Sequence, residues 1–261
     1  CTNTTSQSVT VTPLPVINFT GLGQDYCINE AAATLVGNPP SGTFSGPGIS
    51  GNTFTPSVAG AGTHTITFTY TNGNGCTGVL TQSVTVYALP VVSITPITQQ
   101  FCVTETTVAL AATPAGGTFS GSGVTGTNFN PSVAGVGTHN VVYSYTDING
   151  CTNSANINIV VLALPTITFN GLSAQYCVDA SSVTLTSNPV GGIFSGPGIS
   201  GNVFSPSTAG VGTHTIVCTY TDGNGCTNST SQNVIVTPLP LVSVFGLAPE
   251  YCIDAASAII T

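Results

Sequence analysis

The stretch GTHTITFTYTNGNGC, residues 62–76, alternates between two kinds of side chain along most of its length. Threonine occupies every second position from 63 to 71, and larger side chains lie between: His64, Ile66, Phe68 and Tyr70. Successive side chains of a β-strand point to opposite faces, so this period of two predicts a half-buried strand with its aromatic side chains inward. The following Asn-Gly-Asn-Gly, residues 72–75, is typical of a hairpin turn because Asn and Gly tolerate positive φ.

The same stretch returns at intervals of 75 residues, as GTHNVVYSYTDINGC (137–151) and GTHTIVCTYTDGNGC (212–226). Two series of cysteines keep that interval: Cys1, Cys76, Cys151 and Cys226, and Cys27, Cys102, Cys177 and Cys252. Leu-Pro recurs in the same register, at 14–15, 89–90, 164–165 and 239–240. Internal periodicity decides the domain organisation before length does. We predict the C-terminal strand of a preceding repeat at 1–15, complete repeats at 16–90, 91–165 and 166–240, and the start of a further repeat at 241–261, and we expect the chain to be a segment of a longer protein.

Strand signals follow one another through a complete repeat such as 16–90. They lie at 16–20, 33–36, 42–46 and 52–56 and in the hairpin just described, and no segment has helical periodicity. Six or seven short strands in a repeat of this size predict an all-β fold, a tandem array of small immunoglobulin-like β-sandwich modules of 75 residues. Leu-Pro is expected to join the modules stiffly, because Pro fixes φ and biases its neighbour towards extended geometry.

Charge excludes several kinds of partner. The chain has no Lys or Arg and eight acidic residues, which gives a formal net charge of −8. Nucleic acids and anionic membrane surfaces both attract cationic side chains, so we predict no binding to nucleic acid and no basic membrane-surface contact. No run is long or apolar enough for membrane insertion, and no signal peptide is recognised. With 41% apolar residues, the chain is expected to fold.

The cysteines that keep the 75-residue interval are the strongest chemical signal, and nine cysteines in small repeats indicate an oxidising compartment. Pairing within a repeat would give Cys27–Cys76, Cys102–Cys151 and Cys177–Cys226, each stabilising by about 4 kcal/mol in the chain-entropy model. In a standard sandwich, however, the turn before the last strand and the turn after the first strand lie at opposite ends, so that Cys27 would meet Cys151 of the next repeat. Both pairings stay open, with a slight preference for pairing within the repeat.

Other cysteines and three asparagines have separate predictions. Cys1 and Cys252 would find their partners outside the sequence. Cys218 replaces the inward-facing Phe68 and Tyr143 of the other repeats, so we predict a buried free thiol. Three asparagines begin Asn-X-Ser/Thr sequences and are candidate glycosylation sites in a secreted protein: Asn3, Asn18 and Asn228.

Two further motifs predict neither catalysis nor a cofactor site. GPGISG (46–51 and 196–201) and GSGVTG (121–126) match the dinucleotide fingerprint, but that motif binds pyrophosphate only where a strand enters a helix. Each repeat has a single histidine, at 64, 139 or 214, without a second metal ligand or a consistent acid. We predict hydrogen-bonded histidines at the edge of the core, no enzyme activity and no cofactor.

Calcium stays open as an alternative at the junctions between repeats. A calcium site needs several oxygen ligands, and the acids do not keep their register, since Asp25 corresponds to Gln100 and Gln175. Only Asp179 and Asp254, in the register of Asn29, keep that alternative open.

The stretch GTFSGPGISGNTFTPSVAGAGTHTITFTYTNGNGCT (42–77), with the YC opening and the NGCT turn, resembles the tandem Ig-like or PKD-like repeats of very large secreted surface proteins of Bacteroidota. The resemblance covers the whole chain. It implies an extracellular rod, stalk or fibre exported by the type IX route, in some cases an adhesin, and it carries over no catalytic residues.

Together these observations predict a structural segment of a long extracellular fibre, filament or adhesin stalk at the cell surface, stiffened by Leu-Pro linkers and disulfides. Its partners would be neighbouring repeats and other copies in a filament. The alternative is an adhesion module that binds glycan or another surface through loops that diverge around aromatic or acidic side chains. The loops SGPGISGN, SGSGVTGT and SGPGISGN stay nearly constant, which favours the structural role.

Overall fold

The computed structural model of this protein describes residues 1–244, 250, 253 and 256–257. The chain divides into two compact units. The first contains residues 1–101 and 105–161 and therefore most of two repeats; the second contains residues 102–104 and 162–261. Each repeat builds its own set of sheets, so the predicted all-β, immunoglobulin-like fold is confirmed. The predicted repeat boundaries stay a prediction.

The first repeat, in the first unit, has nine strands and one helical turn. Their bounds are β1 (Asn18–Thr20), β2 (Asp25–Cys27), β3 (Ala33–Thr34), β4 (Val36–Asn38), β5 (Thr43–Ser45), β6 (Ile49–Ser50), β7 (Thr53–Phe54), α1 (Pro56–Ala59), β8 (Gly62–Thr71) and β9 (Thr77–Tyr87). A four-stranded sheet has the order β2-β9-β8-β5, a three-stranded sheet the order β3-β7-β6, and β1 pairs with β4.

The other two repeats follow the same order. In the second the elements are β10 (Ser93–Ile94), β11 (Gln100–Cys102), β12 (Val108–Ala109), β13 (Ala112–Thr113), β14 (Thr118–Ser120), β15 (Val124–Thr125), β16 (Asn128–Phe129), α2 (Pro131–Ala134), β17 (Gly137–Thr146) and β18 (Thr152–Leu162). In the third they are β19 (Thr168–Asn170), β20 (Gln175–Cys177), β21 (Val183–Thr184), β22 (Thr186–Asn188), β23 (Ile193–Ser195), β24 (Ile199–Ser200), β25 (Val203–Phe204), α3 (Pro206–Ala209), β26 (Gly212–Thr221) and β27 (Thr227–Thr237).

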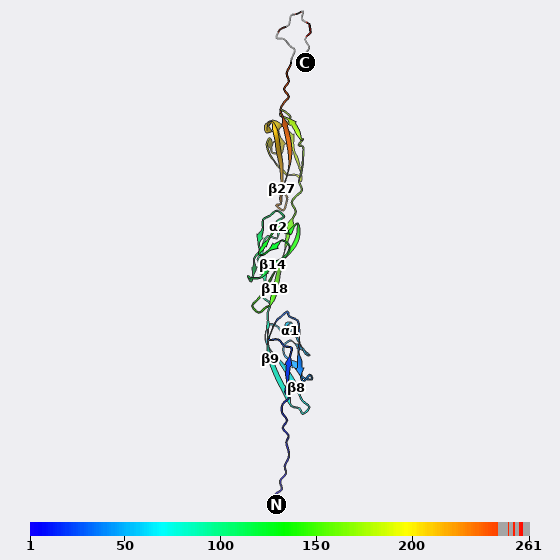
Figure 1. Ribbon diagram of the computed structural model, residues 1–261, viewed down its shortest axis with the longest axis vertical. Coiled ribbons are helices and arrows are strands. Elements are labelled where there is room, and N and C mark those ends of the chain that lie inside the picture. Colours follow the sequence, from blue (N-terminus) through cyan, green and yellow to red (C-terminus); the bar gives the residue numbers. More distant parts are fainter. Residues whose placement is uncertain (245–249, 251–252, 254–255, 258–261) are drawn as a thin grey trace. The chain divides into compact units, whose positions relative to one another are not determined.

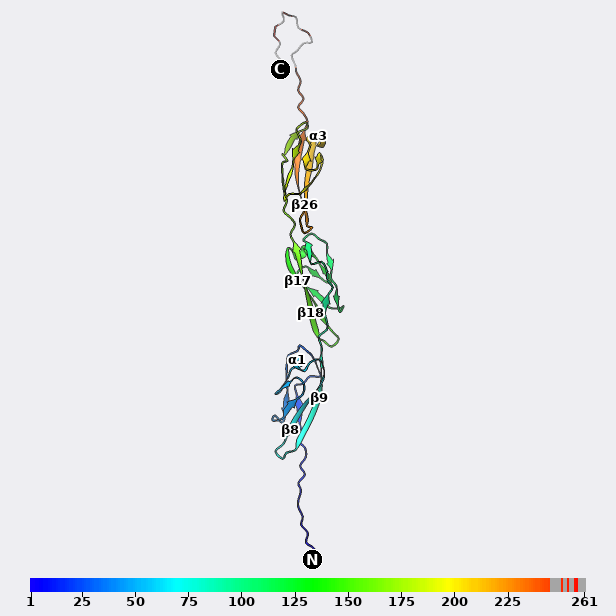
Figure 2. The same ribbon diagram turned by 180° about the vertical axis from the view of Figure 1, so that it is seen from behind.

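The long hairpin of β8 and β9 is the centre of the first repeat (Figures 1 and 2). The two strands pair antiparallel from Thr71↔Thr77 at the turn to Gly62↔Val86 at the far end. Ile66 and Phe68 are fully buried, whereas the threonine face is exposed or half-buried. The predicted alternating strand and its turn are therefore confirmed, and β17–β18 and β26–β27 repeat the same hairpin.

The core of each repeat lies between its four-stranded and three-stranded sheets. In the first repeat Ile66, Val84 and Val86 of the hairpin pack with Leu35 and with Phe54 of β7. Burying such side chains contributes about 1.5–3 kcal/mol each. The helical turn α1 was not predicted from the sequence. Its four residues, PSVA, are too short for any helical periodicity to appear, and Pro supplies the first helical position, where its missing N–H costs nothing.

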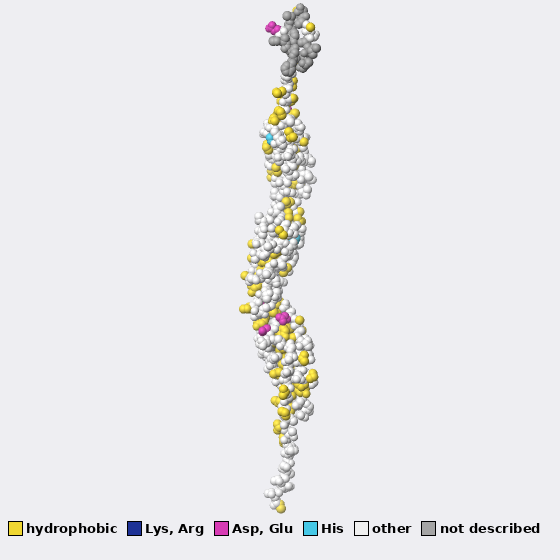
Figure 3. Space-filling model, viewed as in Figure 1, with side chains coloured by type: hydrophobic (Ala, Val, Ile, Leu, Met, Phe, Trp, Pro, Cys, Tyr) yellow, Lys and Arg dark blue, Asp and Glu magenta, His cyan; other side chains and the backbone are white. Residues whose placement is uncertain are grey.

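Uncharged side chains make up most of the surface. Figure 3 shows a face of white polar and backbone atoms with scattered hydrophobic side chains and few acids. In the described part of the chain, no helix is long and apolar enough to cross a membrane.

Candidate functional site

The two cysteine series lie at opposite ends of the hairpin strands. β2 runs parallel to β9 and pairs with its last residues, so that Cys27 lies opposite Tyr87. Cys76 directly precedes β9, eleven residues before Tyr87. At about 3.3 Å per strand residue, Cys27 and Cys76 are roughly 35 Å apart. A disulfide needs Cα atoms no more than about 7 Å apart, so these two cysteines of one repeat cannot pair.

The structure instead joins Cys27 and Cys102 each to the turn of the next repeat. Cys27 bonds to Cys151 within the first unit, and Cys102 bonds to Cys226 within the second. In both bonds the Cα atoms are 5.5 Å apart and the sequence separation is 124 residues. The preferred pairing within a repeat is therefore wrong for these four cysteines, and the alternative is confirmed. Cys102 precedes Cys151 along the chain, so the two disulfide loops overlap.

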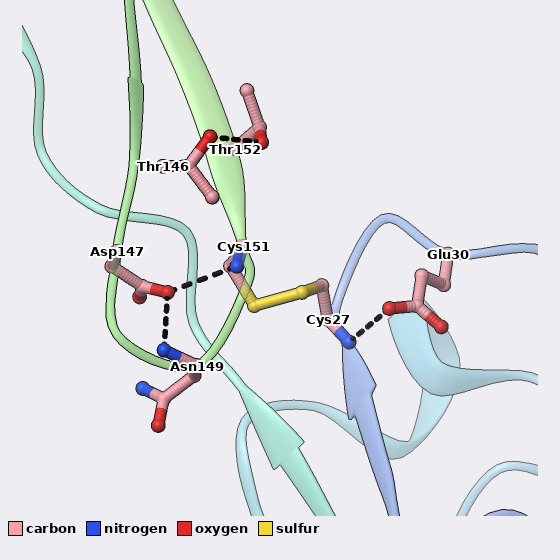
Figure 4. The surroundings of a disulfide bond; sticks show 7 residues. All are labelled: Cys27, Glu30, Thr146, Asp147, Asn149, Cys151 and Thr152. Carbon is pink, nitrogen blue, oxygen red and sulfur yellow. Dashed lines mark hydrogen bonds between the residues drawn. A yellow bond between two sulfur atoms is a disulfide. The ribbon is translucent and has the colours of Figure 1, made fainter. Parts of the chain in front are cut away.

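A tight turn presents Cys151 to Cys27 (Figure 4). The Asp147 carboxylate accepts hydrogen bonds from the backbone N–H groups of Asn149 and Cys151, both at 2.9 Å. The Asp147 N–H in turn donates to the Cys151 carbonyl at 3.0 Å. These bonds fix the backbone on both sides of the sulfur. Asp147 therefore acts as the brace of the turn, which explains why Asn, with the same side-chain oxygen, takes its place at residue 72.

On the other side of the bond, Glu30 holds the backbone of Cys27. The Cys27 N–H donates to Glu30 Oε1 at 3.1 Å (Figure 4), and the Glu30 N–H donates to the Cys27 carbonyl at 3.0 Å. The Leu-Pro linker is tied to the same joint, because Asn153 Nδ2 donates to the Pro90 carbonyl at 2.9 Å. A disulfide, a linker and two braced backbone segments thus meet where the first two repeats join.

The matching contact between the second and third repeats uses one of the predicted glycosylation sites. Asn228 Nδ2 donates to the Pro165 carbonyl at 2.9 Å, as Asn153 does to Pro90. A glycan on Asn228 would be attached to this same nitrogen, which would keep one N–H. Asn3 and Asn18 are exposed. Glycosylation at all three asparagines stays a prediction.

Four described cysteines have no disulfide partner: Cys1, Cys76, Cys177 and Cys218. Cys1 and Cys177 are exposed, and Cys218 is buried, as predicted for a core thiol. Pairing of Cys177 with Cys226 does not occur, since Cys226 is bonded to Cys102. Cys252 lies outside the described residues, so its predicted partner is not addressed.

Around Cys218, a neighbouring side chain makes the hydrogen bonds that a tyrosine makes in the second repeat. In the second repeat Tyr143 Oη donates to the Pro114 carbonyl and accepts from the Gly117 N–H, at 2.6 and 2.7 Å. In the third repeat, where cysteine lacks that hydroxyl, the Ser187 hydroxyl makes the matching bonds to Pro189 and Gly192, at 2.8 and 2.9 Å. Ser187 and Gly192 line a cavity of about 310 Å³.

We expect the Cys218 thiol to react with iodoacetamide at least ~100-fold more slowly than Cys177 in the folded chain, because reagent must wait for the core to open. Burial also raises the pKa of the Cys218 thiol, so less reactive thiolate is present at a given pH. Mass spectrometry of peptides labelled for increasing times measures both rates. In denaturant the two thiols should react at similar rates. If Cys218 and Cys177 also reacted at equal rates in the native chain, that result would contradict the buried position of Cys218.

The remaining predicted motifs have structural partners. Each histidine Nε2 lies 2.7–2.8 Å from the carbonyl of the glycine that ends the helical turn: His64 from Gly60, His139 from Gly135 and His214 from Gly210. Gly48 of the first GPGISG has φ +74°, and a Cβ there would lie 2.7 Å from the Thr55 carbonyl oxygen, so its glycine serves the turn before β6.

Calcium binding stays a prediction. Asp179 is exposed, and Asp254 lies outside the described residues. Among the residues that the structure describes, no three His, Cys, Asp or Glu side chains are grouped so that they could hold a metal ion.

No family model matches the chain, and no curated protein matches its sequence. Several solved structures resemble it. One is a Ca²⁺-stabilised adhesin that helps an Antarctic bacterium bind ice, with 16% identity, 89% of this chain and 76% of that chain covered, and a TM-score of 0.34. Another is a 1.5-MDa bacterial ice-binding adhesin, with 16% identity, coverage of 87% and 98%, and a TM-score of 0.31. A third comprises immunoglobulin domains 1–5 of Sidekick-1, with 12% identity, coverage of 85% and 61%, and a TM-score of 0.25. The fold assignment rests on the strand order and the core of each repeat.

Proposed function

We propose that this chain is a structural segment of an extracellular fibre, filament or adhesin stalk, and that its repeats carry tension. The observation that supports this proposal is the pairing of each bonded cysteine with the turn of the next repeat, in two overlapping loops. Such a disulfide adds a second covalent connection beside the Leu-Pro linker. A joint that is connected twice cannot lengthen by unwinding of the linker alone.

The composition supports the same role. Disulfides persist in oxidising surroundings, which supports a place outside the cell. The absence of Lys and Arg leaves no cleavage site for trypsin-like proteases, and the absence of Met and Trp leaves few oxidisable side chains besides cysteine. These features suit a long-lived surface polymer whose working parts are the repeats themselves.

Tension along the chain follows the shortest covalent path between its ends. With both disulfides intact, that path runs from residue 1 to Cys27, across to Cys151, back to Cys102, across to Cys226 and on to residue 261. It contains about 110 peptide bonds, or about 390 Å when fully extended. After reduction the path contains the whole chain, and its length rises to about 880 Å.

We therefore expect single-molecule pulling between the two ends to reach about 390 Å in the oxidised chain and about 880 Å in the reduced chain. The control is Cys218→Ser. Cys218 takes part in neither disulfide, so its substitution should leave both extended lengths unchanged. An oxidised chain that extends as far as the reduced one would contradict tension-bearing disulfides.

The role at the cell surface is tested by removing residues 91–165 from the protein in its native setting. This deletion preserves the 75-residue register, so Cys27 is expected to bond to Cys226 across the new joint. A stalk would still be displayed and would support adhesion at reduced length, which electron microscopy of unreduced surface material can measure. Loss of adhesion by a correctly displayed and bonded variant would instead favour a ligand-binding role for the deleted repeat.

A further inference from the structure

Two cysteines without a disulfide partner occupy the same positions in their repeats as the bonded ones. Cys177 follows Tyr176 at the end of β20, in the register of Cys27 and Cys102. Cys76 ends the hairpin turn before β9, in the register of Cys151 and Cys226. We propose that each is one half of a further joint, and that its partner is another repeat of this same 75-residue type. This inference deepens the proposed function by naming the partner of both surfaces.

The backbone around Cys177 already has the geometry of a formed joint. Cys177 pairs in parallel with Thr237 as Cys27 does with Tyr87. The Val178 N–H donates to the Thr237 carbonyl at 2.9 Å, and the Ala180 N–H donates to the Cys177 carbonyl at 3.0 Å. The bonds around Cys27 are the same, with Ile28 to Tyr87 at 2.9 Å and Glu30 to Cys27 at 3.0 Å. What differs is exposure, since Cys27 is 6% exposed when bonded and Cys177 is open to solvent.

The turn around Cys76 is formed in the same way. Asn72 Oδ1 accepts from the N–H groups of Asn74 and Cys76, both at 3.0 Å, as Asp147 does at Cys151. The Cys76 sulfur lies 3.0 Å from Thr12 Oγ1. Thr12 is in the register of Tyr87, the residue beside which Cys27 lies. A strand that paired with residues 10–12 as β2 pairs with β9 would therefore end close to Cys76.

Exposed apolar side chains point to the same missing partner. Val9 and Val11 are in the register of Val84 and Val86, which are 0% and 2% exposed in the core of the first repeat. Val9 and Val11 are instead 83% and 90% exposed. Each repeat buries its own valine or isoleucine at these two positions between two sheets, so residues 9–11 lack the sheets of such a repeat. This observation is independent of the cysteines.

The chemistry of each partner follows from the joints that are present. The partner of Cys177 presents an Asx-X-Asn-Gly-Cys turn, followed two residues later by a side chain that can donate to the Pro240 carbonyl, as Asn153 does to Pro90. The partner of Cys76 presents the short Tyr-Cys or Phe-Cys strand of β2 and β11. Both are parts of one kind of repeat.

Bond formation uses a small-molecule disulfide as the oxidant. One cysteine thiolate attacks it and releases one small thiol, which leaves a mixed disulfide on the protein. The thiolate of the second cysteine attacks the protein sulfur of that mixed disulfide and releases the second small thiol. The two cysteines lose two electrons and two protons in all, and the oxidant gains them.

The test inserts a second copy of residues 91–165 between Pro240 and Leu241 of the full chain and oxidises it with oxidised glutathione. Digestion with pepsin in acid limits disulfide exchange, and mass spectrometry of the unreduced peptides identifies each bond. We expect Cys177 to be joined to the inserted copy of Cys151, and its labelling by iodoacetamide to fall at least tenfold. The control carries serine at the inserted copy of Cys151 and should leave Cys177 fully labelled.

A second insertion of the same residues between Pro15 and Val16 tests the other surface, where Cys76 should join the inserted copy of Cys102. Full labelling of Cys177 and Cys76 in the oxidised insertion variants would overturn the inference, and so would dimers in which Cys177 is bonded to Cys177 of another chain, because neither bonded joint pairs two cysteines of the same register. The same digests report Cys27–Cys151 and Cys102–Cys226. If those two bonds form and the new ones do not, this inference alone fails; if those two are absent, the proposed function fails as well.

Discussion

Replacing both Cys27 and Cys151 by serine is expected to lower the free energy of unfolding of the first unit by about 5 kcal/mol. The bond closes a loop with a sequence separation of 124 residues, and the entropy that it removes from the unfolded chain grows with the logarithm of that length. The loop contains most of two repeats. Without the bond, the unfolded state of these two repeats gains conformational entropy and becomes more favourable. Urea denaturation monitored by hydrogen exchange of residues 18–161 measures the change, because exchange separates the two units.

The matched control is Cys177→Ser, which removes an exposed thiol in the same register as Cys27. It should change the free energy of unfolding by less than about 0.5 kcal/mol. A double variant as stable as the original chain would show that the two repeats of the first unit unfold independently of the bond. A control as unstable as the double variant would place the effect in the cysteine side chain rather than in the bond.

Phe54→Ala is expected to lower the free energy of unfolding of the first repeat by about 3–5 kcal/mol. Phe54 is fully buried in β7 and packs with Ile66 and Leu35 in the core between the two sheets. Tyr26, next to Cys27, lies against it with ring centroids 5.4 Å apart. Because this contact supports the strand that presents Cys27, the same substitution should make the Cys27–Cys151 bond easier to reduce. Urea denaturation and the rate of reduction by dithiothreitol measure the two effects.

Val58→Ala is the control for the core substitution. Val58 lies four residues away on the helical turn α1 and is 73% exposed. Its truncation should cost less than about 0.5 kcal/mol and leave the rate of reduction unchanged. A Phe54→Ala variant that lost stability without faster reduction would show that Tyr26 holds the Cys27 strand without help from Phe54.

The sequence predicted the features that depend on local pattern. Threonine at every second position and the Asn-Gly turn identified β8 and its hairpin, and the cysteine interval identified the repeats. The choice between two disulfide pairings was harder, because it depends on where the three residues of β2 pair along β9. A parallel pairing of three residues about sixty positions apart leaves no periodic signal. The opposite ends of a standard sandwich were the available clue, and they indicated the pairing that the structure has.

Other features appear only when distant residues are brought together. Ser187 corresponds to Ala112 and Gly37, and Cys218 to Tyr143 and Phe68, so both substitutions are visible in the sequence. Their link is not visible, because it lies in the hydrogen bonds to Pro189 and Gly192. Asn153 and Asn228 are likewise ordinary polar residues in a strand until Pro90 and Pro165 are placed beside them.

The overlap of the two disulfide loops has a consequence for damage. If one peptide bond is cut anywhere between Cys27 and Cys226, the two pieces remain covalently joined, because at least one disulfide always spans the cut. Pairing within repeats would lack this property, since a single cut between residues 77 and 101 would separate the chain. A molecule nicked within this range therefore keeps its continuity, and a protease must cut it at two places before any part between Cys27 and Cys226 is shed.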